Sequence, residues 1–148
     1  MTMKAQPPAS ERPWRAALSY FGGVFALGFV LGVARTLFVE AGVSRLLGVA
    51  LELPVMLAFS AWWCSRLLRQ QAVPARVPAR LQMGALAFAL LMLAELLLST
   101  LLAGRTLAEH LALYRQPSHK LGLAGQLVFG LMPLGLLGWD WVRPGRSC

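Results

Sequence analysis

Hydrophobic residues gather in four long blocks along the chain, separated by short stretches rich in Arg, Gly and Pro. The blocks cover residues 17–39, 46–64, 81–103 and 121–142. Each is close to the ~20 residues that cross a ~30 Å hydrocarbon core as a helix. None alternates with the two-residue period of a barrel strand. The pattern predicts an all-α polytopic membrane protein, a four-transmembrane-helix bundle that forms a single domain over residues 1–148.

Composition favours lipid as the solvent of these blocks. Of the 148 residues, 57% are hydrophobic and 14% are charged, and the mean hydropathy is +0.62. Soluble domains have about a quarter of their residues charged. So short a chain also has too little interior to hide this much apolar surface in a soluble fold.

The first block shares one property with a signal peptide, a basic start at Lys4, Arg12 and Arg15. Its apolar stretch is longer than the roughly 7–15 residues of a cleaved signal. Gly32-Val33-Ala34 is also a weak cleavage site. We therefore predict a retained first span.

Positive charge predicts the orientation of the spans. With the N-terminus inside, the cytoplasmic segments hold nine Lys and Arg residues and the outer loops hold five, diluted by Glu40 and Glu109. An excess of Lys and Arg is typical of cytoplasmic segments. Both termini are therefore predicted to be cytoplasmic.

The net charge of +8 does not indicate a nucleic-acid partner, because the charges lie at helix ends without a stripe of base-stacking aromatic residues. Anchoring to anionic lipid headgroups is the simpler explanation, so the predicted partner is the lipid bilayer. Aromatic residues near the span ends fit interfacial belts. They are Trp14, Tyr20, Trp62, Trp63, Trp139 and Trp141.

Motifs for catalysis, metals and cofactors are missing from the sequence. Cys64 and Cys148 form no CxxC or zinc pattern. His110 and His119 lie nine residues apart and match no usual metal spacing, so we place both at the solvated interface. There is no P-loop, GxSxG or HExxH. We predict no catalytic residue, no metal and no cofactor.

Ionisable residues inside the apolar blocks are the informative ones, because charges at membrane depth are costly and usually have a partner. Glu52 lies about six residues into the second span from its outer end, or ~9 Å. Glu95 lies about eight residues below the outer end of the third span, or ~12 Å. Arg35 lies at a similar level on the first span.

Three further polar residues fall near that level. Ser99 lies one turn above Glu95 and could bond it, Arg105 follows the third span, and Gln126 lies in the outer third of the fourth. We predict a polar cluster in the outer half of the bundle. Its members are Arg35, Glu52, Glu95, Ser99, Arg105 and Gln126.

Small residues and prolines predict the packing of the helices. Gly28, Gly32 and Arg35 share one helical face, and a GxxxG step lets another helix come close. Pro54 removes a backbone donor inside the second span, and Pro133 predicts a kink in the glycine-rich fourth span.

The loop at residues 105–115 predicts a short amphipathic helix on the outer membrane surface. Thr106 and Glu109 have the spacing of a capping box. The apolar residues share one face, while Glu109 and His110 point away from it. This helix would cover the polar cluster, either as a structural turn or as a lid.

A family resemblance covers nearly the whole chain. The segments ALGFVLG, LELPVMLA, MGALAFALLMLAE and GRTLAEHLALYR resemble small four-span inner-membrane proteins of high-GC proteobacteria. The resemblance implies the four-span architecture and a bacterial inner-membrane location. It implies no activity and supplies no functional residues.

Three functions remain open for the polar cluster. As a structural lock it fits a non-enzymatic accessory or structural membrane component, in a larger membrane complex or a homo-oligomer. As a coupled acid pair, Glu52 and Glu95 would serve a small proton-coupled transporter or channel. An intramembrane acid/base catalyst is the third, for which two glutamates alone are a weak signal. We favour the first.

Overall fold

The computed structural model describes residues 13–142, and every regular element in that range is helical. Four helices are long and apolar enough to span a membrane, which confirms the predicted all-α four-span fold. The elements are α1 (Pro13–Glu40), α2 (Arg45–Gln70), α3 (Val77–Leu97), the π-helix η1 (Leu98–Leu102), α4 (Leu107–Leu113) and α5 (Pro117–Val142). The third span joins α3 to η1, and the four predicted blocks fall on these spans.

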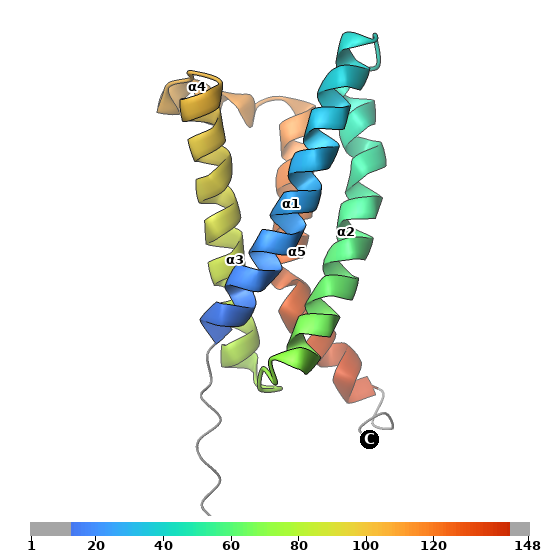
Figure 1. The fold of residues 1–148 in the computed structure, drawn as a ribbon, viewed down its shortest axis with the longest axis vertical. Coiled ribbons are helices and arrows are strands. Elements are labelled where there is room, and N and C mark those ends of the chain that lie inside the picture. The colour runs from blue at the N-terminus through green and yellow to red at the C-terminus, as the bar shows by residue number, and fades with distance from the viewer. Residues whose placement is uncertain (1–12, 143–148) are drawn as a thin grey trace, which may run out of the picture.

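The spans form a ring in which α1 and α5 lie opposite each other, each packed against both α2 and α3. Figure 1 shows α1 crossing the bundle at a slant, from beside α3 at its start to beside α2 at its end. We call the end with α4 and the α1–α2 loop the α4 half. The end with the α2–α3 loop, the start of α1 and the end of α5 is the terminal half.

Local sequence determines where the helices begin and end. α1 stops in a Schellman motif, in which Gly42 adopts φ +98° and the Val43 N–H donates to the Phe38 carbonyl at 3.0 Å. α2 stops in the same way with Ala72 at φ +47°, a conformation that a Cβ disfavours. Pro117 begins α5, where its missing N–H costs nothing. The resulting tight connections keep sequential spans antiparallel.

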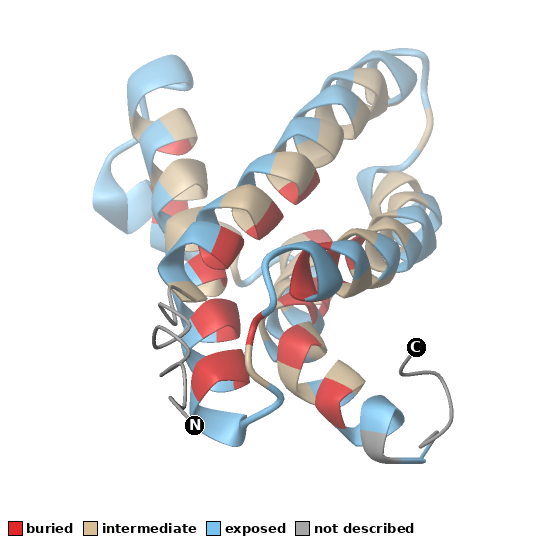
Figure 2. Cartoon of the chain, turned by 60° about the horizontal axis from the view of Figure 1, so that its bottom comes forward, coloured by how far each residue is buried: buried red, intermediate tan, exposed pale blue. Residues whose placement is uncertain are grey.

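The packed core lies in the terminal half, where Figure 2 shows most of the buried positions. Tyr20, Cys64 and Met83 are fully buried there. The other core residues are Ala16, Ala17, Val24, Leu67, Leu68, Val73, Ala79, Ala87 and Phe129.

The belt prediction is wrong for Tyr20, which is a core residue. Trp63 is half-buried, and its indole N–H donates to the Ser19 carbonyl at 2.9 Å. The side chain of Trp141 lies outside the described part of the chain. Three predicted belt residues are exposed, namely Trp14, Trp62 and Trp139.

Tyr20 completes a hydrogen bond that α5 cannot make alone. In an α-helix the carbonyl of residue 129 accepts from the N–H of residue 133, but Pro133 has no N–H. The Tyr20 hydroxyl donates to the Phe129 carbonyl at 2.9 Å, and the two rings stack with centroids 4.4 Å apart. α1 therefore supplies the donor that α5 lacks, across the centre of the bundle.

Of the predicted packing positions, Gly28 faces Met56 of α2, whose Cε lies 3.1 Å from a Cβ built on the glycine. Gly32 does not have this role. The nearest atom to a Cβ there is Nη2 of Arg35, at 3.7 Å, so no described residue of another helix approaches it. The helix continues through Pro54, and Pro133 is fully buried.

The closest helix contact was missed from the sequence. A Cβ on Gly84 of α3 would overlap the carbonyl of Gly130 on α5 and lie 3.5 Å from Cδ of Pro133. Glycine therefore lets the two backbones meet in the terminal half.

Arg80 is buried near the terminal end, with 4% of its surface exposed. Its Nε donates to the Pro74 carbonyl at 3.3 Å, and its Nη2 lies 3.5 Å from the Asp140 carboxylate. The charge thus ties the α2–α3 loop to the end of α5.

Candidate functional site

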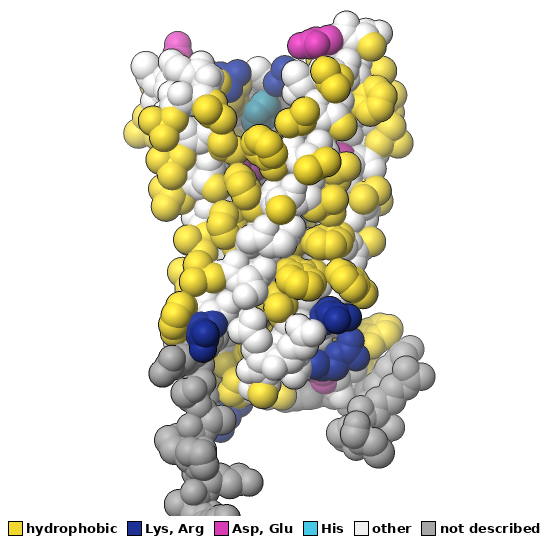
Figure 3. Space-filling model, viewed as in Figure 1, with side chains coloured by type: hydrophobic (Ala, Val, Ile, Leu, Met, Phe, Trp, Pro, Cys, Tyr) yellow, Lys and Arg dark blue, Asp and Glu magenta, His cyan; other side chains and the backbone are white. Residues whose placement is uncertain are grey.

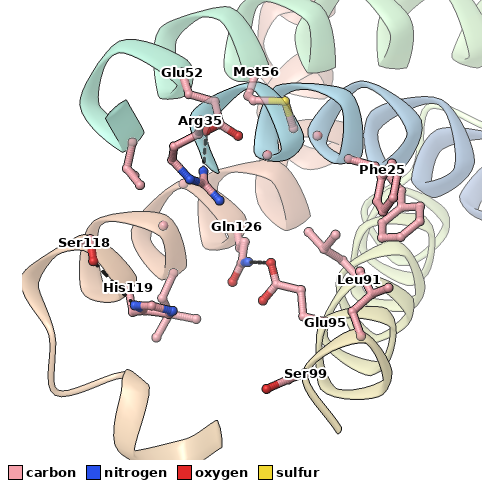
Figure 4. A pocket seen from close by; sticks show the side chains of 18 of the residues that line it. Phe25, Arg35, Glu52, Met56, Leu91, Glu95, Ser99, Ser118, His119 and Gln126 are labelled. Carbon is pink, nitrogen blue, oxygen red and sulfur yellow. Dashed lines mark hydrogen bonds and ion pairs between the residues drawn. The ribbon is translucent and has the colours of Figure 1, made fainter. Parts of the chain in front are cut away.

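A cavity of about 550 Å³ occupies the α4 half. All four spans and α4 contribute to its wall, and Figure 4 shows the side chains that face it. All six members of the predicted polar cluster line it. Ligand pockets commonly measure ~300–1,000 Å³, so the size is suited to a small molecule.

Arg35 of α1 bonds Glu52 of α2 through Nη1 and Oε2 (Figure 4). Gly48, one turn before Glu52, makes room for this contact, because a Cβ there would press on Cγ of Arg35 at 3.0 Å. About a third of the Arg35 side chain remains exposed. The pair braces α1 against α2 and leaves Nη2 of Arg35 outside that bond.

Glu95 of α3 accepts a hydrogen bond from the side-chain amide of Gln126 on α5 (Figure 4). A Cβ on the neighbouring Gly125 would overlap Leu53 of α2, so glycine allows this face of α5 to come close. The pair braces α3 against α5. The six predicted residues thus share one cavity, while the two carboxylates have different partners.

The short helix α4 closes the end of the cavity, and its predicted capping box is confirmed. The Thr106 side chain accepts from the Glu109 N–H at 3.3 Å, and the Thr106 N–H donates to the Glu109 carboxylate at 2.7 Å. That backbone bond first, and the Thr106 hydroxyl second, hold the pKa of Glu109 below its ordinary value.

The rotation of α4 differs from the prediction. His110 is 8% exposed and lines the cavity, so its predicted place at the solvated interface is wrong. Its ring meets the edge of Tyr114, with centroids 5.6 Å apart. Burial first, and the Glu95 carboxylate second, raise the pKa of the Tyr114 phenol. The Tyr114 phenol thus lies within electrostatic range of Glu95.

The π-helix η1 lies between α3 and α4 and was not predicted. Its wider turn is shown by the Ala103 N–H, which bonds the Leu98 carbonyl five residues back at 3.2 Å. Gly104 then adopts φ +64°, and the Arg105 N–H bonds the Ser99 carbonyl at 3.1 Å. Short π-helices are frequent at functional sites, and η1 lies in the cavity wall.

Three buried polar atoms on the cavity wall have no hydrogen-bond partner among the described residues. They are Oγ of Ser99, Nδ1 of His110 and Oε1 of Gln126. Ser99 is 7% exposed, and the predicted bond to Glu95 is not made. Leaving a buried polar group unpaired costs ~1–3 kcal/mol. The wall therefore presents unused donors and acceptors to whatever fills the cavity.

The other end of the cavity is apolar, formed by Phe25, Leu91 and Phe129. The cavity also reaches the flank of the bundle, because Phe29, Val33 and Leu102 line it while being half-exposed or more. Figure 3 shows this hollow between the α4 halves of α1 and α3, with basic side chains on both sides and a histidine inside. A polar interior thus opens sideways, beside exposed apolar residues of the α1 and α3–η1 spans.

Four cavity residues were missed as site residues in the sequence. Arg45, His110, Tyr114 and His119 all line it. Within residues 13–142, no group of three or more His, Cys, Asp or Glu side chains could hold a metal ion.

Comparison with known proteins gives no match, neither to a family model nor to a curated protein or a solved structure. The chemistry of the cavity is therefore inferred from its geometry.

Proposed function

We propose that the chain is a non-enzymatic membrane component that binds the polar end of an amphipathic molecule in its α4 half. The observation behind this proposal is the set of unpaired buried atoms on Ser99, His110 and Gln126 around a sideways-opening cavity. A bound polar group would satisfy them. Its apolar part would leave between α1 and α3, where Phe29 and Val33 are exposed.

The accessory role fits this proposal. Within the described residues, a bundle with short loops has little surface outside the membrane, so its partners would be membrane molecules, including a larger complex or a second copy. The charge pattern predicts that both termini are cytoplasmic, and the resemblance implies a bacterial inner membrane. In that arrangement the cavity would serve the outer leaflet.

The test uses two glycines of α5. Gly122 lines the cavity, Gly135 does not, and a Cβ on either meets nothing within 4 Å. Gly122→Leu therefore fills the cavity, and Gly135→Leu is a matched control on the same helix. The tagged proteins are released from their native membrane in gentle detergent and weighed by native mass spectrometry.

We expect a small lipid-like molecule on the wild type and on Gly135→Leu, and its loss from Gly122→Leu. Equal retention by all three proteins would contradict binding in the cavity. A different protein at fixed stoichiometry in all three would support the accessory role and identify its complex.

A second candidate is a small proton-coupled transporter or channel, favoured by the unlike environments of its two acids. Glu52 is bonded to a cation, while Glu95 is bonded to a neutral amide. Proton flux into vesicles distinguishes the candidates. Transport predicts that Glu52→Gln and Glu95→Gln keep the fold and lose pH-dependent flux, whereas a binding protein shows no flux before or after either change.

A further inference from the structure

Two arginines at the rim of the cavity differ from Arg35 in their pairing. Arg45 begins α2 and Arg105 lies in the loop after η1, so the two residues stand at opposite sides of the ring. Within the described part of the chain, Arg35 is paired with Glu52 and neither rim arginine has an ion pair. Glu109 lies within electrostatic range of Arg105, but its carboxylate is bonded to Thr106.

The positive fields of these arginines meet inside the cavity. Arg35, Arg45 and Arg105 all lie within electrostatic range of His119, whose ring faces the cavity in Figure 4. The unpaired Oγ of Ser99, on a side chain more than nine-tenths buried, lines the same wall. Cationic and neutral donors thus converge on the cavity. Its two lining acids, Glu52 and Glu95, are bonded to Arg35 and Gln126, and the exposed Glu40 does not line it.

Resting on the proposed function, we infer that the polar end of the ligand carries a phosphate, held between the guanidinium groups of Arg45 and Arg105. Guanidinium forks match both carboxylate and phosphate oxygens. A phosphate offers more oxygens and up to two charges, so it can be shared by two arginines and still accept from Ser99 or His119. A carboxylate with two oxygens would leave donors unused.

The phosphate has two sources, a lipid headgroup or the free anion. The opening between α1 and α3 favours the lipid, because the half-exposed Phe29 and Val33 offer apolar contact to a chain leaving the cavity. An amphiphile in a leaflet has its polar headgroup at the surface and its chain in the hydrocarbon. The polar rim and the apolar flank of the cavity follow the same order.

The test compares three probes with the same oleoyl chain, namely lysophosphatidic acid, oleate and monoolein. Each is titrated onto the delipidated full-length protein in neutral detergent, and the bound fraction is measured by native mass spectrometry. We expect one lysophosphatidic acid per chain, bound at least roughly tenfold more tightly than monoolein, since a charge-assisted hydrogen bond changes affinity by about that factor or more. Oleate should fall between them.

Arg45→Gln/Arg105→Gln should reduce the preference for lysophosphatidic acid over monoolein to nearly one. Arg115→Gln/Lys120→Gln is the matched control, since both residues are exposed near the α4 end and neither lines the cavity. An equal loss in the two double variants would overturn the inference, because it would show attraction to surface charge alone.

Inorganic phosphate, added as a competitor, separates the two sources. Displacement of lysophosphatidic acid at similar concentration supports the phosphate site with the free anion as its ligand. Resistance to inorganic phosphate supports the lipid headgroup.

The same measurements distinguish a failure of the phosphate inference from a failure of the proposed function. If lysophosphatidic acid binds no better than monoolein and Gly122→Leu removes both, the phosphate is overturned while the cavity stands. If Gly122→Leu and Gly135→Leu bind all three probes as the wild type does, the cavity itself fails as a binding site and the inference falls with it.

Discussion

The two halves of the bundle use the same four helices in opposite ways. In the terminal half, Gly84 meets Gly130 backbone to backbone and Tyr20 supplies the hydrogen bond that Pro133 removes. In the α4 half the helices separate around a cavity, and side-chain pairs brace them instead. Where the backbones touch, an added side chain would clash. Where side chains reach across a cavity, some of their polar atoms remain free to bind a ligand.

The comparison is tested most strongly by adding one methyl group to each half. Gly84→Ala in the terminal half forces a Cβ into the Gly130 carbonyl, and we expect a loss of about 3 kcal/mol, the upper part of the usual range for overpacking. Gly122→Ala in the α4 half meets nothing and should gain up to ~1 kcal/mol from helix propensity. Unfolding in SDS, followed by circular dichroism, measures both. Similar effects at the two sites would contradict the contrast between the halves.

The next effect concerns the shared hydrogen bond of the terminal half. Tyr20→Phe leaves the buried Phe129 carbonyl without its donor, and we expect a cost of ~1–3 kcal/mol. Adding Pro133→Ala restores a backbone N–H, so the double variant should recover part of the loss. A double-mutant cycle measures the coupling. Strict additivity would show that Pro133 and the Tyr20 hydroxyl act independently.

A smaller effect is expected from the brace between α1 and α2. Glu52→Gln leaves Arg35 without its anion. Removing one partner of a fully buried pair costs ~3–5 kcal/mol, but Arg35 is a third exposed, so we expect about 1–2 kcal/mol after discounting for solvent screening. The same SDS titration measures it, with Glu40→Gln at the exposed end of α1 as a neutral control. A loss above that of Gly84→Ala would reverse the order of the two halves.

The smallest effect is a pH dependence confined to α4. The pKa of Glu109 is lower in the folded chain than in the unfolded one, so its stabilisation of α4 is fully present above the ordinary carboxyl pKa. It is lost as the pH falls through the lowered value. Hydrogen exchange of the α4 amides, corrected for the intrinsic rate, should speed up in that window. Glu109→Gln should remove the pH dependence while α1 to α3 stay unchanged.

The fold was predictable because four apolar blocks of membrane-spanning length have few alternative structures. The capping box at Thr106 and Glu109 was equally clear, since it depends on residues three apart on one short helix. Depth along each span also brought Glu52 and Glu95 to one level, and the structure places both on one cavity.

The sequence did not predict the rotation of each helix about its own axis. Which side chain pairs with which depends on how each helix turns about its axis, so Glu95 is bonded to Gln126 and Ser99 is left unpaired. The amphipathic pattern of α4 did not reveal that His110 faces inward, because one short turn can lie on either its apolar or its polar side. The composition of Leu98–Leu102 does not predict a π-helix.

The slant of α1 links the cavity to the thickness of the bilayer. A helix of 28 residues is ~42 Å long, against ~30 Å of hydrocarbon, so we expect α1 to lean in a bilayer. Thinner bilayers make a long helix lean further, and thicker ones let it stand. Because α1 parts from α3 in the α4 half (Figure 1), the same lean sets the width of the gap between them. We therefore expect lipid thickness to change access to the cavity through hydrophobic mismatch on α1.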